Sequence, residues 1–278
     1  MKILFVTDIH GIKWKYERVM HEAKALNIDL LINGGDMLPF GDFFKQDQFI
    51  LNFLDKYFSK LEEARIHHLC MLANDDLLIY DNLFEKICSN YQYIHPIAQK
   101  SFKYNNLEFI GMNWVTDLPF ALKDRARKDT EKFVLPKQFG KPVISTPNGW
   151  KKINDWPSYL DNLPTIEEEL KKLITPINMS NTIYIFHMPP ANIGLDVCHD
   201  GRKVGSKAIY DFIKNNQPKM TFHGHIHESA KVSGYWNSYI NKTLCIQPGQ
   251  SFFHEDTVIC CIIDIETMEY KRLRLTNA

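Results

Sequence analysis

The chain has 278 residues, of which 45% are hydrophobic and 24% are charged, a composition typical of a globular protein with a substantial core. Lys plus Arg and Asp plus Glu are equal at 33 each, so the net charge favours neither nucleic acid nor a membrane as a partner. The sequence shows no secretory signal and no apolar run near the roughly 18–20 residues that span a bilayer, so we expect a cytoplasmic protein. Its six scattered cysteines are expected to be buried, reduced thiols.

Strands and helices are predicted to alternate in the first third of the chain. Apolar runs predict strands at residues 2–7, 30–32 and 66–72, and apolar residues recur at helical spacing in both connections. This order favours a parallel sheet with right-handed crossovers. Residues 102–110 read as a hairpin that joins the sheet system.

The alternation breaks down between residues 114 and 180. This segment contains seven prolines, and only Thr165–Ile174 has helical spacing, with Thr165 and Glu168 placed as a capping box. Its aromatic residues favour packing over disorder. We therefore expect a single domain over residues 1–278 with an irregular insert at about 114–180.

The alternation resumes after the irregular segment. Ser206 is placed to cap a helix between the first two of the later strands. These strands are expected at residues 182–186, 220–222, 243–246, 258–263 and 270–275.

Polar residues follow five of the predicted elements. Each group alone has an ordinary explanation, such as a turn, a helix cap or a hydrogen-bonded core histidine. If the first strand continues through Asp8 and His10, both side chains point to the same side. Because open α/β sheets place their sites at the carboxyl ends of strands, the five groups together predict one site. They are Asp8-Ile9-His10, Gly35-Asp36, Asn74-Asp75-Asp76, His187 and Gly224-His225-Ile226-His227.

The side chains in these groups are carboxylates, imidazoles and an amide, without a thiolate. This set favours two divalent cations chosen from Mn, Fe, Zn and Co, with Mn preferred. Two such cations about 3.5–4 Å apart are a device for attacking phosphate esters with a metal-bound hydroxide.

The same residues resemble the motifs of the calcineurin-like metallophosphoesterase family, which run D-x-H, G-D, G-N-H-D/E, H and G-H-x-H along the chain. The resemblance implies the calcineurin-like phosphoesterase fold, a two-sheet α/β sandwich with flanking helices. It implies hydrolysis of phosphate esters by a metal-bridging hydroxide. It also implies the ligand set: Asp8, His10 and His227 for one cation, Asn74, His187 and His225 for the other, and Asp36 as the bridge.

One position departs from the family pattern. Family members often carry His after the Asn ligand, where it assists the leaving group, and this chain has Asp75. Three interpretations are open: the leaving group needs little protonation, another residue supplies the acid, or catalysis is weak. His223 is a candidate acid, although a strand histidine facing the other way is the simpler interpretation. Asp76 matches a family carboxylate that orients neighbouring groups.

The resemblance leaves the substrate open. We expect a small phosphorylated substrate, with nucleotides among the candidates, no membrane partner and no nucleic acid. A phosphodiesterase is favoured over a monoesterase; the alternatives are a weakly catalytic binding scaffold on the same fold and a nuclease. Nine basic and three acidic residues lie between Lys123 and Lys152. They form either a flap over the substrate or a solvated face whose positive charge is balanced by the acidic residues Glu167–Glu169. Substrate-binding residues are not assigned.

Overall fold

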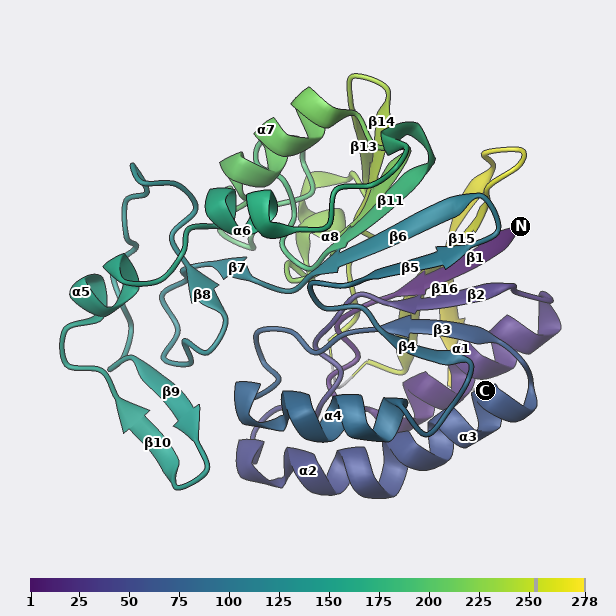
Figure 1. The fold of residues 1–278 in the computed structure, drawn as a ribbon, viewed down its shortest axis with the longest axis horizontal. Helices are drawn as coiled ribbons and strands as arrows, with labels where there is room; N and C mark the ends of the chain where they lie inside the picture. The colour runs from purple at the N-terminus through teal and green to yellow at the C-terminus, as the bar shows by residue number, and fades with distance from the viewer. Residues whose placement is uncertain (253–254, 278) are drawn as a thin grey trace.

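The computed structural model describes residues 1–252 and 255–277 and contains two six-stranded sheets that pack face to face (Figure 1). The first sheet has the order β16-β15-β1-β2-β3-β4. Strands β1, β2 and β3 are parallel, as predicted, and β4, which was not predicted, extends this parallel set beside β3. Strand β15 runs antiparallel to β1 at the other side. The bounds are β1 Lys2–Val6, β2 Leu30–Asn33, β3 His67–Cys70, β4 Ile94–Pro96, β15 Thr257–Asp264 and β16 Tyr270–Thr276.

The second sheet has the order β13-β14-β12-β11-β6-β5, with β6, β11, β12 and β14 parallel. The predicted hairpin is present as β5 and β6, and it pairs Phe102 with Phe109. The bounds are β5 Ser101–Tyr104, β6 Leu107–Met112, β11 Thr182–Phe186, β12 Met220–Phe222, β13 Asn237–Ile240 and β14 Thr243–Ile246.

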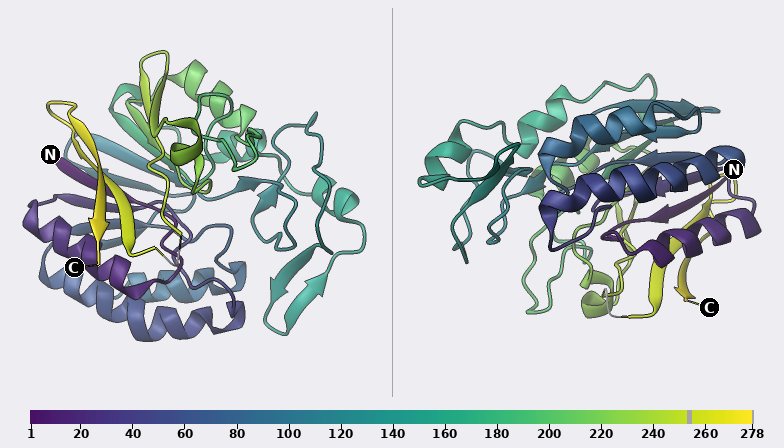
Figure 2. Two further views of the ribbon diagram at one scale, coloured as in Figure 1. Left: turned by 180° about the vertical axis from the view of Figure 1, so that it is seen from behind. Right: turned by 90° about the horizontal axis from the view of Figure 1, so that it is seen from below.

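Helices cover the outer face of each sheet (Figure 2). On the first sheet these are α1 Lys13–Ala25, α2 Gln46–Phe49, α3 Asp55–Glu63 and α4 Asp81–Cys88, with a π turn at Ile50–Leu54 joining α2 to α3. On the second sheet they are α6 Ile166–Lys172 and α7 Lys207–Asn216, while α8 is a short helix at Ser229–Ser233. Short 3-10 turns occupy Phe43–Lys45, Leu78–Tyr80 and Met179–Asn181.

Strand β1 shows how the layers are held together. Ile3 and Phe5 point into the core between the two sheets, whereas Leu4 and Val6 point into the core between the first sheet and its helices. Side chains alternate along a strand, so a strand covered on both faces reads as an unbroken apolar run. The third core, between the second sheet and α6 and α7, includes Phe186 and Ile209.

Most of the 114–180 segment projects from one end of the sandwich, whereas α6 lies on the second sheet (Figure 1). Trp156 and Leu160 are buried in a small core of its own, which agrees with the expectation of packing. The predicted capping box is confirmed at Thr165 and Glu168. The strand pairs and the first helix here were not predicted: β7 Val115–Thr116, β8 Ala126–Arg127, β9 Val143–Thr146, β10 Gly149–Lys152 and α5 Trp156–Asp161. The single-domain assignment stays a prediction.

Within the part of the chain that the structure describes, no helix combines the length and the apolar character that a membrane crossing requires.

Candidate metal centre

The loops that carry the predicted ligands have an unusual backbone. Asp8, His10, Asp36 and His225 have φ of 57°, 48°, 51° and 70°, in the left-handed region that non-glycine residues rarely adopt. Such conformations are held by the surrounding structure and gather at functional sites. The condition that the first strand continues through Asp8 and His10 is therefore not met. Strand β1 ends at Val6 and the chain turns instead.

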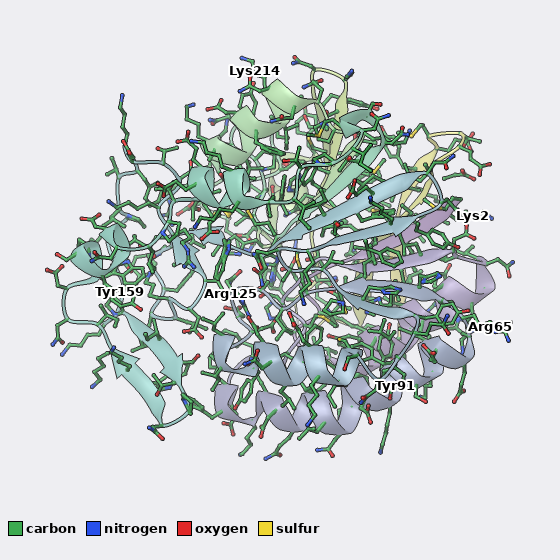
Figure 3. All side chains as sticks on the ribbon, in the orientation of Figure 1. Lys2, Arg65, Tyr91, Arg125, Tyr159 and Lys214 are labelled. Atoms are coloured by element: carbon green, nitrogen blue, oxygen red, sulfur yellow. The ribbon has the colours of Figure 1, made fainter. Side chains whose placement is uncertain are left out.

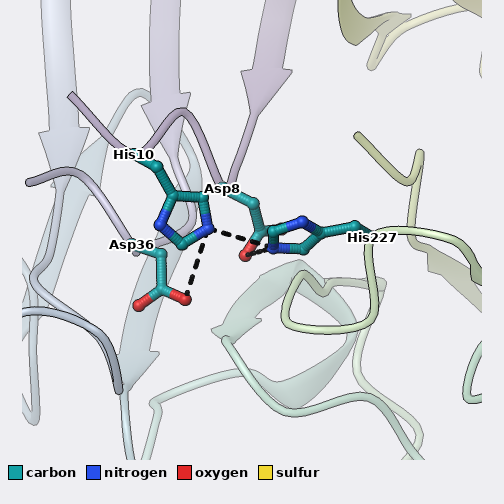
Figure 4. Close-up of side chains that lie close together, drawn as sticks. All are labelled: Asp8, His10, Asp36 and His227. Atoms are coloured by element: carbon teal, nitrogen blue, oxygen red, sulfur yellow. Dashed lines mark hydrogen bonds and ion pairs between the residues drawn. The ribbon is translucent and has the colours of Figure 1, made fainter. Parts of the chain in front are cut away.

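Four of the predicted ligands form a first cluster. The ligand atoms of Asp8, His10, Asp36 and His227 all lie within 4.8 Å of one another (Figure 4). Nε2 of His10 lies 3.0 Å from Nε2 of His227 and 3.9 Å from Oδ2 of Asp36. Nε2 of His227 lies 3.5 Å from Oδ1 of Asp8. Side chains from the loops after β1, β2 and β12 thus converge on one point.

A second cluster adjoins the first and shares Asp36 with it. The ligand atoms of Asp36, His187 and His225 lie within 4.8 Å of one another. Oδ1 of Asn74 lies 2.9 Å from Nε2 of His187, so the amide oxygen belongs to the same group. The membership of the two clusters is the same as in the ligand set that the resemblance implies, and Asp36 is common to both.

The residues fit a pair of divalent cations. Nε2 of His225 is buried and has no hydrogen-bond partner among the described residues, which a cation would supply. Nδ1 of His187 lies 2.9 Å from the carbonyl oxygen of Gly34. A proton on Nδ1 would leave Nε2 unprotonated towards the cluster, as outer hydrogen bonds do for histidine ligands.

The buried acids and imidazoles have altered pKa values. Although burial opposes ionisation, His227 and His187 lower the pKa of Asp8, and His187 lowers that of Asp36. Burial and the neighbouring His227 lower the pKa of His10 to about 4, so its imidazole is neutral at pH 7. Asp36 and Asp8 overcome the opposing effect of burial and raise the pKa of His187 to about 9, so a proton and a cation compete there.

Asp76 joins the two loops on which ligands stand. Its carboxylate accepts hydrogen bonds from the backbone N–H groups of Met37 at 3.0 Å, Leu38 at 2.7 Å and Ala73 at 2.7 Å. The residue is fully buried. Asp76 therefore fixes the loop after Asp36 against the loop that carries Asn74.

Asp75 faces the clusters. Its Oδ2 lies 3.9 Å from Nδ1 of His10, and its backbone N–H donates to Oδ1 of Asp36 at 2.9 Å. Burial and the Asp36 carboxylate raise the pKa of Asp75 to about 8. A bound cation would act in the opposite direction. The position that often holds His in the resembled family thus presents a carboxyl group.

His223 does not face the clusters. The residue is fully buried, its Nε2 lies 2.7 Å from Oγ1 of Thr221, and its Nδ1 lies 3.1 Å from the carbonyl oxygen of Met188. Both ring nitrogens are occupied inside the protein. This geometry does not support the predicted role as an acid for the leaving group and agrees with the simpler interpretation of a core histidine.

Part of the basic excess in the 114–180 segment is structural. Lys123, Arg125 and Arg127 are buried and pair with Asp117, Asp81 and Glu169. Their charge is not available to a substrate. No local sequence pattern indicates these three ion pairs. The acidic partner is either distant along the chain or cannot be told from other nearby acidic residues.

Comparison with known proteins was made on both sequence and structure. The family model described as calcineurin-like phosphoesterase matches residues 1–229. One solved structure aligns with 99% of this chain and 99% of its own at 17% identity and a TM-score of 0.65. The protein TT1561 of Thermus thermophilus aligns over 100% of this chain and 99% of its own, at 13% identity and a TM-score of 0.60. These two likenesses show the fold alone. No curated protein matches this sequence significantly.

Proposed function

Because this chain belongs to the calcineurin-like phosphoesterase family, we propose that it is a metal-dependent hydrolase that prefers phosphodiesters. The observation that supports this most directly is the pair of side-chain clusters that share Asp36. Asp8, His10 and His227 would hold one cation, and Asn74, His187 and His225 the other. A catalytically weak scaffold would not need to keep both clusters complete.

The two cations would supply a nucleophilic water at neutral pH and offset the negative charge that develops on the phosphoryl group. The chain's own residues set this up. The Asp8 and Asp36 carboxylates bring two negative charges into a buried site. The backbone N–H of His225 donates to both oxygens of Asp8, at 3.1 and 3.2 Å, which fixes that carboxylate.

The proposed preference for diesters rests on Asp75. Its carboxyl group faces the clusters, close to His10. A phosphate monoester carries about −1.5 to −2 charge at pH 7, whereas a diester carries about −1. Bound cations would favour the ionised form of Asp75 against the effect of burial, and the resulting carboxylate would repel a monoester more strongly than a diester. The substrate we propose is a small phosphodiester, a class that includes cyclic nucleotides.

The test is turnover of the purified protein with two esters that share a leaving group. With Mn²⁺, bis-p-nitrophenyl phosphate should be hydrolysed faster than p-nitrophenyl phosphate, and Fe²⁺, Zn²⁺ and Co²⁺ should be compared in parallel. Asp36→Ala and Asn74→Ala should abolish both reactions. Asp211→Ala, in the partly exposed Lys207–Asp211 ion pair of α7, is the control. Turnover retained in both ligand variants would refute the proposal.

A further inference from the structure

Four aromatic side chains form a wall beside the candidate metal centre. The ring of Phe40 lies 6.4 Å from that of the predicted ligand His10 and 5.4 Å from that of Phe43, measured between centroids. Trp150 of β10 then contacts Phe43 at 5.9 Å and Phe44 at 4.8 Å. We call Phe40, Phe43, Phe44 and Trp150 the aromatic wall. It joins the loop after β2 to the projecting 114–180 segment.

The loop that presents Phe40 is firmly held. The N–H groups of Met37 and Leu38 donate to the buried carboxylate of Asp76. Nε2 of Gln46 donates to the carbonyl oxygen of Pro39 at 3.1 Å. Phe40 nevertheless remains 68% exposed. One exposed ring would be ordinary, but Phe40 continues a contiguous group of aromatic rings, and exposed apolar patches of this kind mark binding sites.

We infer that the aromatic wall binds a flat aromatic group of the substrate, an aryl or nucleobase substituent of the phosphoester. This inference rests on the proposed function, because the position of Phe40 next to His10 matters only if a phosphate binds at the clusters. Aromatic rings stack on such groups or meet them edge-on. Trp150 is 42% exposed, and the exposed Lys151 and Lys152 follow it on β10, which suits an anionic ligand.

A hollow on the His227 side of the clusters fits this role less well. It has a volume of about 520 Å³ and includes His227 in its lining. Its basic residues Lys231, Arg272 and Arg274 face the acidic residues Glu228, Glu255 and Asp256 in equal number. The hollow therefore offers an anionic ester no net attraction, and the aromatic wall is the better site for the organic group.

The experiment measures binding without turnover. Phenylphosphonate and methylphosphonate share the phosphonate group and differ in the substituent on phosphorus, which is a phenyl ring in one and a methyl group in the other. Calorimetric titration of the Mn²⁺-loaded protein should show tighter binding of phenylphosphonate by about tenfold, the scale of stacking on one aromatic side chain. Phe40→Ala should reduce this preference to about twofold or less, and Phe40→Trp should keep it. Phe120→Ala removes a ring that is 61% exposed elsewhere in the 114–180 segment and should leave the preference intact.

The possible results separate this inference from the proposed function. Equal affinity for the two phosphonates in the unaltered protein, or a preference that survives Phe40→Ala, would overturn the aromatic wall even if diesters are hydrolysed. A preference lost in Phe40→Ala but kept in Phe120→Ala supports it, even in a protein that shows no turnover. Bound Mn²⁺ should be measured in every variant, because loss of the cation would lower both affinities together and leave their ratio as the deciding quantity.

Discussion

Arg125 donates a hydrogen bond from Nε to the carbonyl oxygen of Ala73 over 2.8 Å, and Ala73 directly precedes the predicted ligand Asn74. The same guanidinium pairs with both oxygens of Asp81, at 3.1 and 2.5 Å. Its side chain is 1% exposed and lies where the projecting segment meets the body of the protein (Figure 3). The 114–180 segment thus supports the loop that carries Asn74.

Replacing Arg125 with Met should destabilise the fold and weaken metal binding together. The change leaves the carbonyl oxygen of Ala73 without its donor and Asp81 without its partner, at a cost of about 2–3 kcal/mol in the free energy of unfolding. Urea denaturation without metal would measure the first effect and calorimetric titration with Mn²⁺ the second. Arg125→Lys keeps the charge and should restore part of both. Unchanged Mn²⁺ affinity in a folded Arg125→Met protein would show that the contact does not position Asn74.

Asp36 is common to both clusters, so its loss should affect both cations, whereas loss of an outer ligand should affect mainly one. We expect close to two equivalents of Mn²⁺ in the unaltered protein, about one in His10→Ala, and fewer than one in Asp36→Ala. Elemental analysis after dialysis would measure this. Mn²⁺ at a hundred times its Kd should also stabilise the unaltered protein by about 2.7 kcal/mol for each site that it fills, and a chelator should reverse that effect. Two equivalents retained in Asp36→Ala would contradict the bridging role.

Much of the candidate site was predictable because it is tied to strand ends. Asp8 and Asp36 follow neighbouring parallel strands of the first sheet, and His187 follows a strand of the second. Parallel strands bring their carboxyl ends to one edge, so apolar runs followed by ligand-type residues carried the necessary information. The same local signals predicted the capping box at Thr165.

The parts that were not predicted depend on contacts between distant residues. Asp8 and His10 turn out of the strand direction because their N–H groups donate to the carbonyl oxygens of Gly35 at 3.0 Å and Asp36 at 2.9 Å. No local sequence pattern predicts these hydrogen bonds between the two loops. Arg125 similarly looked like one member of a basic run, and only its burial against Ala73 and Asp81 reveals its role.

Asp76 should be essential for stability as well as for metal binding. Asp76→Ala would leave three backbone N–H groups, those of Met37, Leu38 and Ala73, without their acceptor. Each buried unpaired group costs about 1–3 kcal/mol, so we expect a loss of at least about 3 kcal/mol. Asp76→Asn keeps one acceptor oxygen and should lose less. Chemical denaturation of the metal-free proteins would test this order, and equal stability of the two variants would contradict it.

Asp75 should control the choice between monoesters and diesters. Asp75→Asn removes the negative charge that Asp75 would carry near His10 with the cations bound, and Asp75→His introduces the side chain that the family often has here. Both changes should lower KM for p-nitrophenyl phosphate, since a monoester at pH 7 carries more charge than a diester and gains more from the loss of repulsion. Asp75→His should in addition raise kcat for an alkyl monoester such as glycerol phosphate, because an imidazole can protonate a poor alkoxide leaving group, for which general acid catalysis typically contributes about 10²–10⁴-fold. Steady-state kinetics on the two p-nitrophenyl esters, whose leaving group needs little protonation, and on the alkyl ester would separate these effects. If both variants kept the original ratio of kcat/KM between diester and monoester, the carboxyl group of Asp75 would not be the source of the preference.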